Sequence, residues 1–74
     1  MPTETDSETK IHFGQRLKAL RITRGYSQEG LALASGLDRS YIGGVERGER
    51  NISLLNIYKL SKSLNLSPRE FFES

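Results

Sequence analysis

Residues 27–48, SQEGLALASGLDRSYIGGVERG, contain two short segments of helical character separated by a glycine. Ser27 can cap a first helix, and Gly36 can take the positive φ with which such a helix ends. Asp38 can cap a second helix, which ends at Gly48. The sequence therefore predicts a pair of short helices joined by a tight turn.

Further helical patterns flank this pair. Apolar residues recur at helical spacing over about 11–24, and Ser53 can cap a longer helix that ends near Asn65. At 67–70, SPRE combines a capping serine, a proline at the first helical position and a glutamate at the third. No alternating apolar pattern long enough for a strand occurs. We therefore expect a compact all-α domain of five helices, with the central pair as helices two and three.

The chain has 74 residues, of which 35% are hydrophobic and 27% charged, and this suffices for one small domain. With no cysteine and a single histidine, it offers no disulfide framework, no catalytic thiol and no zinc site. We expect neither a metal nor a cofactor. No segment approaches the about 20 apolar residues that cross a bilayer, so we expect a cytoplasmic protein without a membrane partner.

The charges are unevenly distributed along the chain. The net charge is +2, but three of the acids precede every base: Glu4, Asp6 and Glu8. Residues 10–74 therefore carry 11 bases against 6 acids, a net charge of +5. We expect residues 1–9 to form a disordered acidic tail and residues 10–74 to form the folded domain. A basic domain of this kind favours a polyanionic partner such as DNA.

Two short helices joined by a glycine-containing turn, with a basic residue at the start of the second, are typical of a helix-turn-helix. A plain helical corner of a bundle is the alternative for this pattern alone. SQEGLA at 27–32, GL at 36–37, Ile42 and VERG at 45–48 resemble the phage repressor/Cro type of helix-turn-helix, the XRE family. The resemblance covers about residues 11–72. LDRSYI at 37–42 and ERGERN at 46–51 are most similar to the controller proteins of restriction-modification systems.

This resemblance implies a repressor-like fold and a sequence-specific transcription regulator that binds pseudo-palindromic operators in double-stranded DNA as a homodimer. Controller proteins often regulate their own promoters. The alternative is an antitoxin-like or other protein-binding module with the same fold, which would expose a larger apolar surface or carry a neutralising segment. Activation would also require a contact with RNA polymerase, which Glu29, Glu49 or the acidic tail could supply.

The base-reading positions of the family fall on Arg39, Ser40 and Tyr41. The Arg39 guanidinium can span O6 and N7 of one guanine, a contact worth about 1–3 kcal/mol of discrimination. Ser40 could reach a base or a phosphate. The Tyr41 ring could lie on thymine methyl groups, or its hydroxyl could bind a phosphate. For Arg39 the alternative is a solvated surface charge.

The positions that match backbone or adjacent contacts in the family are Gln28, Arg50, Asn51 and Ser53. Gln28 lies in the first turn of a helix, where free N–H groups and the positive end of the dipole favour an anion. Phosphate contacts of this kind position the protein without reading sequence. Asn51 and Ser53 could instead serve only as helix caps.

Three features of the motif concern structure more than recognition. The resemblance pairs Arg21 with Glu46 in an ion pair that ties the first helix to the end of the recognition helix. Gly30 stands where the family has glutamate, and Gly43 and Gly44 lie inside the recognition helix, where each glycine costs about 1 kcal/mol relative to alanine. The two glycines either let the backbone approach DNA closely or are tolerated at a surface, and Gly44 would read no base.

One such module covers about 600–1,000 Å², whereas specific DNA complexes bury about 1,000–2,500 Å². A two-fold dimer would double the contacts and place its recognition helices about 34 Å apart. A short terminal helix cannot bury Leu66, Phe71 and Phe72 by itself. We expect Phe71 in the core, and Leu66 and Phe72 in the dimer interface, joined by Tyr58 if it lies on the outer face of its helix.

The sequence gives no support for an enzyme. His12 has no evident partner, and the carboxylates are scattered along the chain. The glycines at 43 and 48 have the spacing of a phosphate-binding loop, but Glu49 stands where that loop requires lysine. No catalytic residue is therefore assigned.

Overall fold

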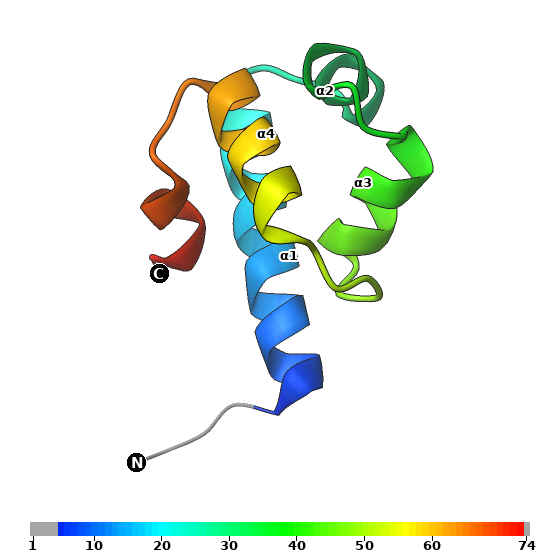
Figure 1. Cartoon of the computed structure of the whole chain (residues 1–74), viewed down its shortest axis with the longest axis vertical. Helices are drawn as coiled ribbons and strands as arrows, with labels where there is room; N and C mark the ends of the chain where they lie inside the picture. The colour runs from blue at the N-terminus through cyan, green and yellow to red at the C-terminus, as the bar shows by residue number, and fades with distance from the viewer. Residues whose placement is uncertain (1–4, 74) are drawn as a thin grey trace.

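A computed structural model describes residues 5–73. Its elements are α1 (Asp6–Thr23), α2 (Gln28–Ser35), α3 (Arg39–Glu46), α4 (Leu54–Leu64) and the 3-10 helix η1 (Pro68–Phe72). Figure 1 shows α2 and α3 together on one side of the long helix α1, with η1 on the other. No strand occurs between residues 5 and 73, so the predicted all-α class is confirmed. The last element is a 3-10 helix, so the prediction of five α-helices is corrected to four.

A single hydrophobic core joins all five elements. It receives three residues from α1, one from α2, two from α3, two from α4 and one from η1: Phe13, Leu17, Leu20, Leu31, Ile42, Val45, Leu60, Leu64 and Phe71. Phe71 is completely buried, as the sequence predicted. Because each helix contributes to one core, α3 is held in a fixed orientation against α1 and α2.

The backbones of α1 and α3 approach each other closely at Gly14. A Cβ atom at Gly14 would lie 2.6 Å from the Glu46 carbonyl oxygen and even closer to that of Val45. Just after α3, Gly48 has a φ of +77°, and a Cβ there would lie 2.6 Å from Cγ1 of Ile11. Glycine at these two positions therefore lets α1 and α3 cross at backbone contact.

The first helix begins earlier than the sequence predicted. α1 starts at Asp6 instead of residue 11, so residues 6–9 are helical and the disordered tail predicted over 1–9 is wrong there. Thr5 Oγ1 accepts a hydrogen bond from the Glu8 N–H at 3.1 Å, and the Glu8 carboxylate accepts one from the Thr5 N–H at 2.9 Å. This reciprocal capping box explains the early start. Residues 1–4 lie outside the described part of the chain.

The other helix caps mostly follow the sequence. Ser27 accepts from the Gly30 N–H at 2.9 Å, and Ser53 accepts from the Asn56 N–H at 3.2 Å. Gly36 ends α2 with a φ of +77°. The predicted side-chain cap at Asp38 is wrong: Asp38 stands at the N-cap, but its carboxylate accepts a hydrogen bond from the Ser40 hydroxyl at 3.3 Å.

At the C-terminal end, η1 is fastened to α1. Arg16 Nε donates a hydrogen bond to the Glu70 carbonyl oxygen at 2.7 Å. The Glu70 carboxylate accepts from the Ser67 N–H at 3.3 Å, which agrees with the capping box predicted at 67–70. These contacts hold Phe71 in the core.

Candidate nucleic-acid interface

A buried ion pair anchors α3. Arg21 Nε lies 2.6 Å from Glu46 Oε2, and Arg21 Nη2 donates to Glu46 Oε1 at 3.0 Å. The two side chains are only 9% and 3% exposed. Arg21 Nη1 also donates to the Tyr26 carbonyl oxygen at 2.8 Å. The predicted pair is therefore present, and its hydrogen bonds satisfy both charges within the fold.

Gln28 is attached to the same pair. Its Nε2 donates a hydrogen bond to Glu46 Oε1 at 3.0 Å. Since Gln28 is the first residue of α2, this bond fixes its side chain beside the free N–H groups of that helix end. Gln28 is half-buried, so part of its amide stays accessible. Its predicted phosphate contact stays a prediction.

Arg39 and Ser40 form the exposed first turn of α3. The Arg39 side chain is 60% exposed, and its Nε lies 3.7 Å from Oε1 of Glu29, which is also exposed. An ion pair of this kind is worth little in water, so Arg39 can exchange it for another anion or for a base edge. The base contacts assigned to Arg39 and Ser40 stay predictions.

Tyr41 is held more firmly than its neighbours. It is half-buried and packs against the core, and its hydroxyl oxygen accepts a hydrogen bond from Asn56 Nδ2 at 3.1 Å. The Arg50 guanidinium carbon lies 5.6 Å from the centre of its ring. Tyr41 is therefore only partly exposed, and its hydroxyl oxygen already accepts one hydrogen bond within the fold. Its base-reading role stays a prediction.

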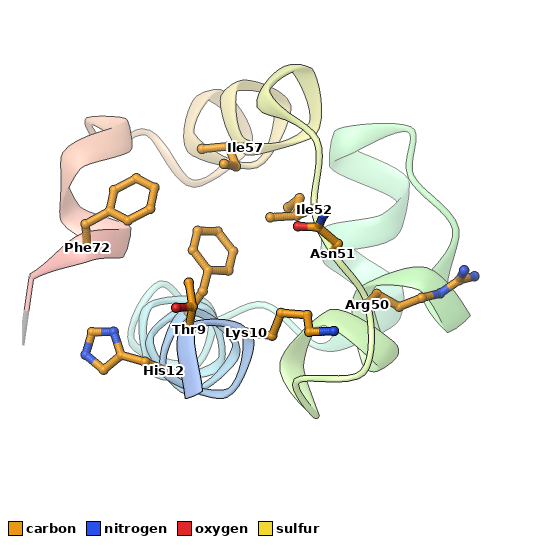
Figure 2. Close-up of a pocket in the computed structure, with 9 residues that line it drawn as sticks. Thr9, Lys10, His12, Arg50, Asn51, Ile52, Ile57 and Phe72 are labelled. Carbon is orange, nitrogen blue, oxygen red and sulfur yellow. The ribbon is translucent and has the colours of Figure 1, made fainter. Parts of the chain in front are cut away.

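The loop after α3 carries Arg50 and Asn51, both exposed, and leads to Ser53. The Ser53 hydroxyl caps α4 by accepting a hydrogen bond from the Asn56 N–H. The DNA contact predicted for Ser53 would have to use the same oxygen. Figure 2 shows a hollow beside the loop, with Asn51 and Ile52 at its wall and Arg50 pointing away from it. The hollow has a volume of about 410 Å³. Arg50 thus leaves the loop on the side of α3.

Arg47 was not among the residues predicted from the sequence to contact DNA. This exposed side chain lies beside the position that a Cβ of Gly43 would occupy, 3.1 Å from its Nη1, and pairs with Glu49 at 3.2 Å. Gln28 Oε1 lies 3.5 Å from the same position. The sequence could have indicated Arg47, because residues 39, 43 and 47 are spaced by four and so lie on one helix face.

The exposed first turn of α3 is therefore basic and polar. Exposed apolar side chains lie on other elements, including Leu33 of α2, which is 87% exposed. Four of them lie on α4 and η1: Leu54, Leu55, Tyr58 and Phe72. The Phe72 ring lies 5.6 Å from that of Phe13, so one of its sides is covered. Leu66, predicted in the dimer interface with Phe72 and Tyr58, is half-buried and packs against the core, so only part of it is available there.

Between residues 5 and 73 there is neither a metal-binding cluster nor a membrane-spanning helix. No group of three or more histidine, aspartate or glutamate side chains could hold a metal ion. None of the helices in this part of the chain is both long and apolar enough to cross a membrane.

Comparison with known proteins identifies the motif. A family model described as Helix-turn-helix, HTH_3, matches residues 17–71. Among curated proteins, the control protein C.BamHI of Bacillus amyloliquefaciens is 42% identical over 65 residues, which are 86% of this chain and 80% of the relative.

Two solved structures extend the similarity to three dimensions. The restriction-modification controller protein C.AhdI from Aeromonas hydrophila is 61% identical, with a TM-score of 0.85 over 86% of this chain and 97% of that one. The controller protein C.Esp1396I bound to a 19 base pair DNA duplex is 36% identical, with a TM-score of 0.78 over 85% and 84% of the two chains.

Proposed function

Since the chain belongs to the XRE-type helix-turn-helix family and is a transcription regulator of the restriction-modification controller type, we propose that it binds a pseudo-palindromic operator as a homodimer and regulates its own promoter. The family model covers α2, α3 and every core residue except Phe13.

The observation that carries the proposal is the exposed first turn of α3, which the fold holds rigidly. Arg39 and Ser40 lie outward there, while Glu46 at the other end of the same helix is locked to Arg21. A recognition helix needs this combination, because its end must enter the major groove in one orientation. A controller relative seen bound to a DNA duplex, similar over 85% of this chain, supports the same use of the fold.

The side chains divide into two roles in this proposal. Arg39 reads a base edge, with Ser40 and Tyr41 beside it, whereas Gln28 binds a phosphate at the start of α2. Arg50 and Asn51 contact the backbone or bases next to the site read by α3. The exposed Arg47 adds positive charge on the face that α3 shares with Gln28.

The dimer is proposed from exposed apolar residues outside the DNA-binding face. Leu54 and Tyr58 are four residues apart and so share one side of α4, with Leu55 next to them and Phe72 on η1. Exposed apolar side chains grouped in this way often mark a protein–protein contact, and a second copy of the chain would cover them. A two-fold pair also supplies the second recognition helix that a pseudo-palindrome requires.

The proposal is tested by selection from a random duplex library at near-physiological salt, followed by sequencing of the bound fraction. An inverted repeat with half-sites about one helical turn apart is the expected result. Arg39→Ala serves as the matched variant and should enrich a repeat that is degenerate at one position per half-site. Absence of any enriched sequence, with binding that disappears as salt rises, would contradict the proposal and favour an antitoxin-like or other protein-binding role.

A further inference from the structure

Gly44 lies in the interior of α3 and is buried under a side chain from another part of the chain. A Cβ atom at Gly44 would stand 2.7 Å from Cγ of Arg50, and 3.6 Å from its Cδ and its Nε. No non-bonded carbon atoms approach as closely as 2.7 Å. The Arg50 side chain therefore runs along α3 through the space that any side chain at residue 44 would fill.

Further contacts hold Arg50 in this position. Its guanidinium carbon lies 5.6 Å from the centre of the Tyr41 ring, one turn before Gly44 on the same face of α3. Tyr41 cannot move away easily, because its hydroxyl accepts a hydrogen bond from Asn56 on α4. Arg50 thus packs against Gly44 and Tyr41.

The backbone of the loop directs Arg50 onto Gly44 and Tyr41. The Glu49 N–H donates a hydrogen bond to the Gly44 carbonyl oxygen at 2.9 Å, and Gly48 turns the chain with a φ of +77°. The chain at residue 50 therefore runs back over α3, the helix that precedes the turn. No acid between residues 5 and 73 forms an ion pair with Arg50, so its guanidinium remains available to a ligand.

We propose that Gly44 is a specificity-determining residue that acts through Arg50: the missing side chain lets Arg50 pack over α3 at residue 44, and from there its guanidinium reads a base edge. The inference rests on the proposed DNA binding and deepens it. A guanidinium there can span two acceptors of one guanine. A side chain on residue 44 itself that is short enough not to obstruct the approach of α3 to DNA could not do so. The recognition surface thus includes one arginine, Arg39, from the helix and one from the loop.

Gly43 provides the contrast. A Cβ there would lie 3.1 Å from Nη1 at the tip of Arg47, which is exposed and can move, and at an ordinary contact distance of 3.5 Å from Gln28. Alanine at residue 43 should therefore be accommodated, whereas alanine at residue 44 meets the stem of Arg50. Gly43→Ala is the matched control, because both substitutions remove one glycine from the interior of α3.

The position of Arg50 can be tested by NMR on the free protein. In the wild type, the Tyr41 ring should shift the Arg50 side-chain proton resonances upfield. Gly44→Ala should return them to random-coil values, and Gly43→Ala should leave them shifted. An unchanged Arg50 spectrum in a folded Gly44→Ala variant would overturn the inference before any DNA is added.

Its role in recognition is tested by a double-mutant cycle on the duplex that the wild type selects. Gly44→Ala and Arg50→Ala should each lower the affinity for this duplex about 10-fold or more, as expected for loss of one bidentate base contact in each half-site. The double variant should bind no worse than Arg50→Ala alone. Gly43→Ala should stay within about 2-fold of the wild type.

The outcomes separate the inference from the proposed function. If Gly44→Ala weakens binding by the same factor in the Arg50→Ala background, the glycine acts by close approach of its own backbone and the inference is overturned. If Gly44→Ala binds as the wild type does, it is overturned as well. If the wild type itself does not distinguish the selected duplex from random DNA, the proposed function fails, and the inference fails with it.

Discussion

Gln28 and Arg21 donate hydrogen bonds to the same carboxylate oxygen, Oε1 of Glu46, each at 3.0 Å. Glu46 therefore joins α1, α2 and α3 at one buried point. The residue proposed to bind a phosphate and the helix proposed to read bases share this point, so their relative positions are fixed before DNA is met. Such preorganisation lowers the entropy cost of binding.

Removing this junction should destabilise the protein strongly. Glu46→Ala leaves Arg21 buried without its partner, and breaking a buried pair in this way costs about 3–5 kcal/mol. Urea denaturation followed by circular dichroism would measure the loss. The double variant Arg21→Met, Glu46→Leu should be less destabilised than Glu46→Ala, because it strands no charge. A loss below about 1 kcal/mol for Glu46→Ala would mean that the pair is not buried in solution.

The crossing of α1 and α3 makes a second prediction. Gly14→Ala places a methyl group against the carbonyl oxygens of Val45 and Glu46, which are backbone atoms and cannot rotate away. We expect a loss of about 3 kcal/mol or more in the free energy of unfolding. Gly25→Ala is the matched control: its site is open but has a φ of +82°, so the cost should be only about 1 kcal/mol. Equal Tm values for the two variants would contradict the backbone contact.

The capping box at the start of α1 makes stability depend on pH. The backbone hydrogen bond from Thr5, with a smaller contribution from its hydroxyl, holds the pKa of Glu8 below its ordinary value of 4.5. A lowered pKa in the folded state means that the stabilisation is present above pH 4.5 and is lost as the pH falls through the folded-state pKa. The wild type should therefore have a higher Tm than Glu8→Ala at pH 7, and this difference should shrink in acid. A difference that is constant between pH 7 and pH 3 would exclude the capping role of the carboxylate.

The proposed dimer is open to a direct measurement. Tyr58→Lys places a charge among the exposed apolar residues of α4, so the substitution should shift the dimer to monomer in sedimentation equilibrium with little change in Tm. Lys59→Ala is the control, because residue 59 is exposed on the same helix and is not apolar in the wild type. A wild type that is monomeric at micromolar concentration, both free and on its operator, would contradict the dimer.

Features governed by neighbouring residues could be predicted from the sequence. The caps at Ser27 and Ser53 and the end of α2 at Gly36 depend only on residues within one turn, and the structure confirms all three. The Arg21–Glu46 pair joins distant residues, and the family resemblance supplied it. Local chemistry and resemblance together therefore identified the motif and its orientation.

The sequence did not reveal features that depend on competition between local signals or on tertiary placement. The acidic run before residue 10 suggested a tail, although Thr5 and Glu8 have the spacing of a capping box. The terminal segment forms a 3-10 helix, and Arg16 binds the Glu70 carbonyl oxygen there. The place of Arg50 over Gly44 depends on how a loop returns across a helix, which no local pattern encodes.

In the proposed complex, Arg39 reads sequence whereas Gln28 only positions the protein. The most direct test measures the affinities of the wild type, Arg39→Ala and Gln28→Ala for the selected operator, for every single-base-pair variant of it and for random DNA. Arg39→Ala should lose its preference at one base pair per half-site, a discrimination of about 1–3 kcal/mol, and keep the other preferences. Gln28→Ala should bind every duplex more weakly by a similar factor. Equal losses on specific and random DNA for both variants would show that Arg39 and Gln28 do not divide base reading and positioning between them.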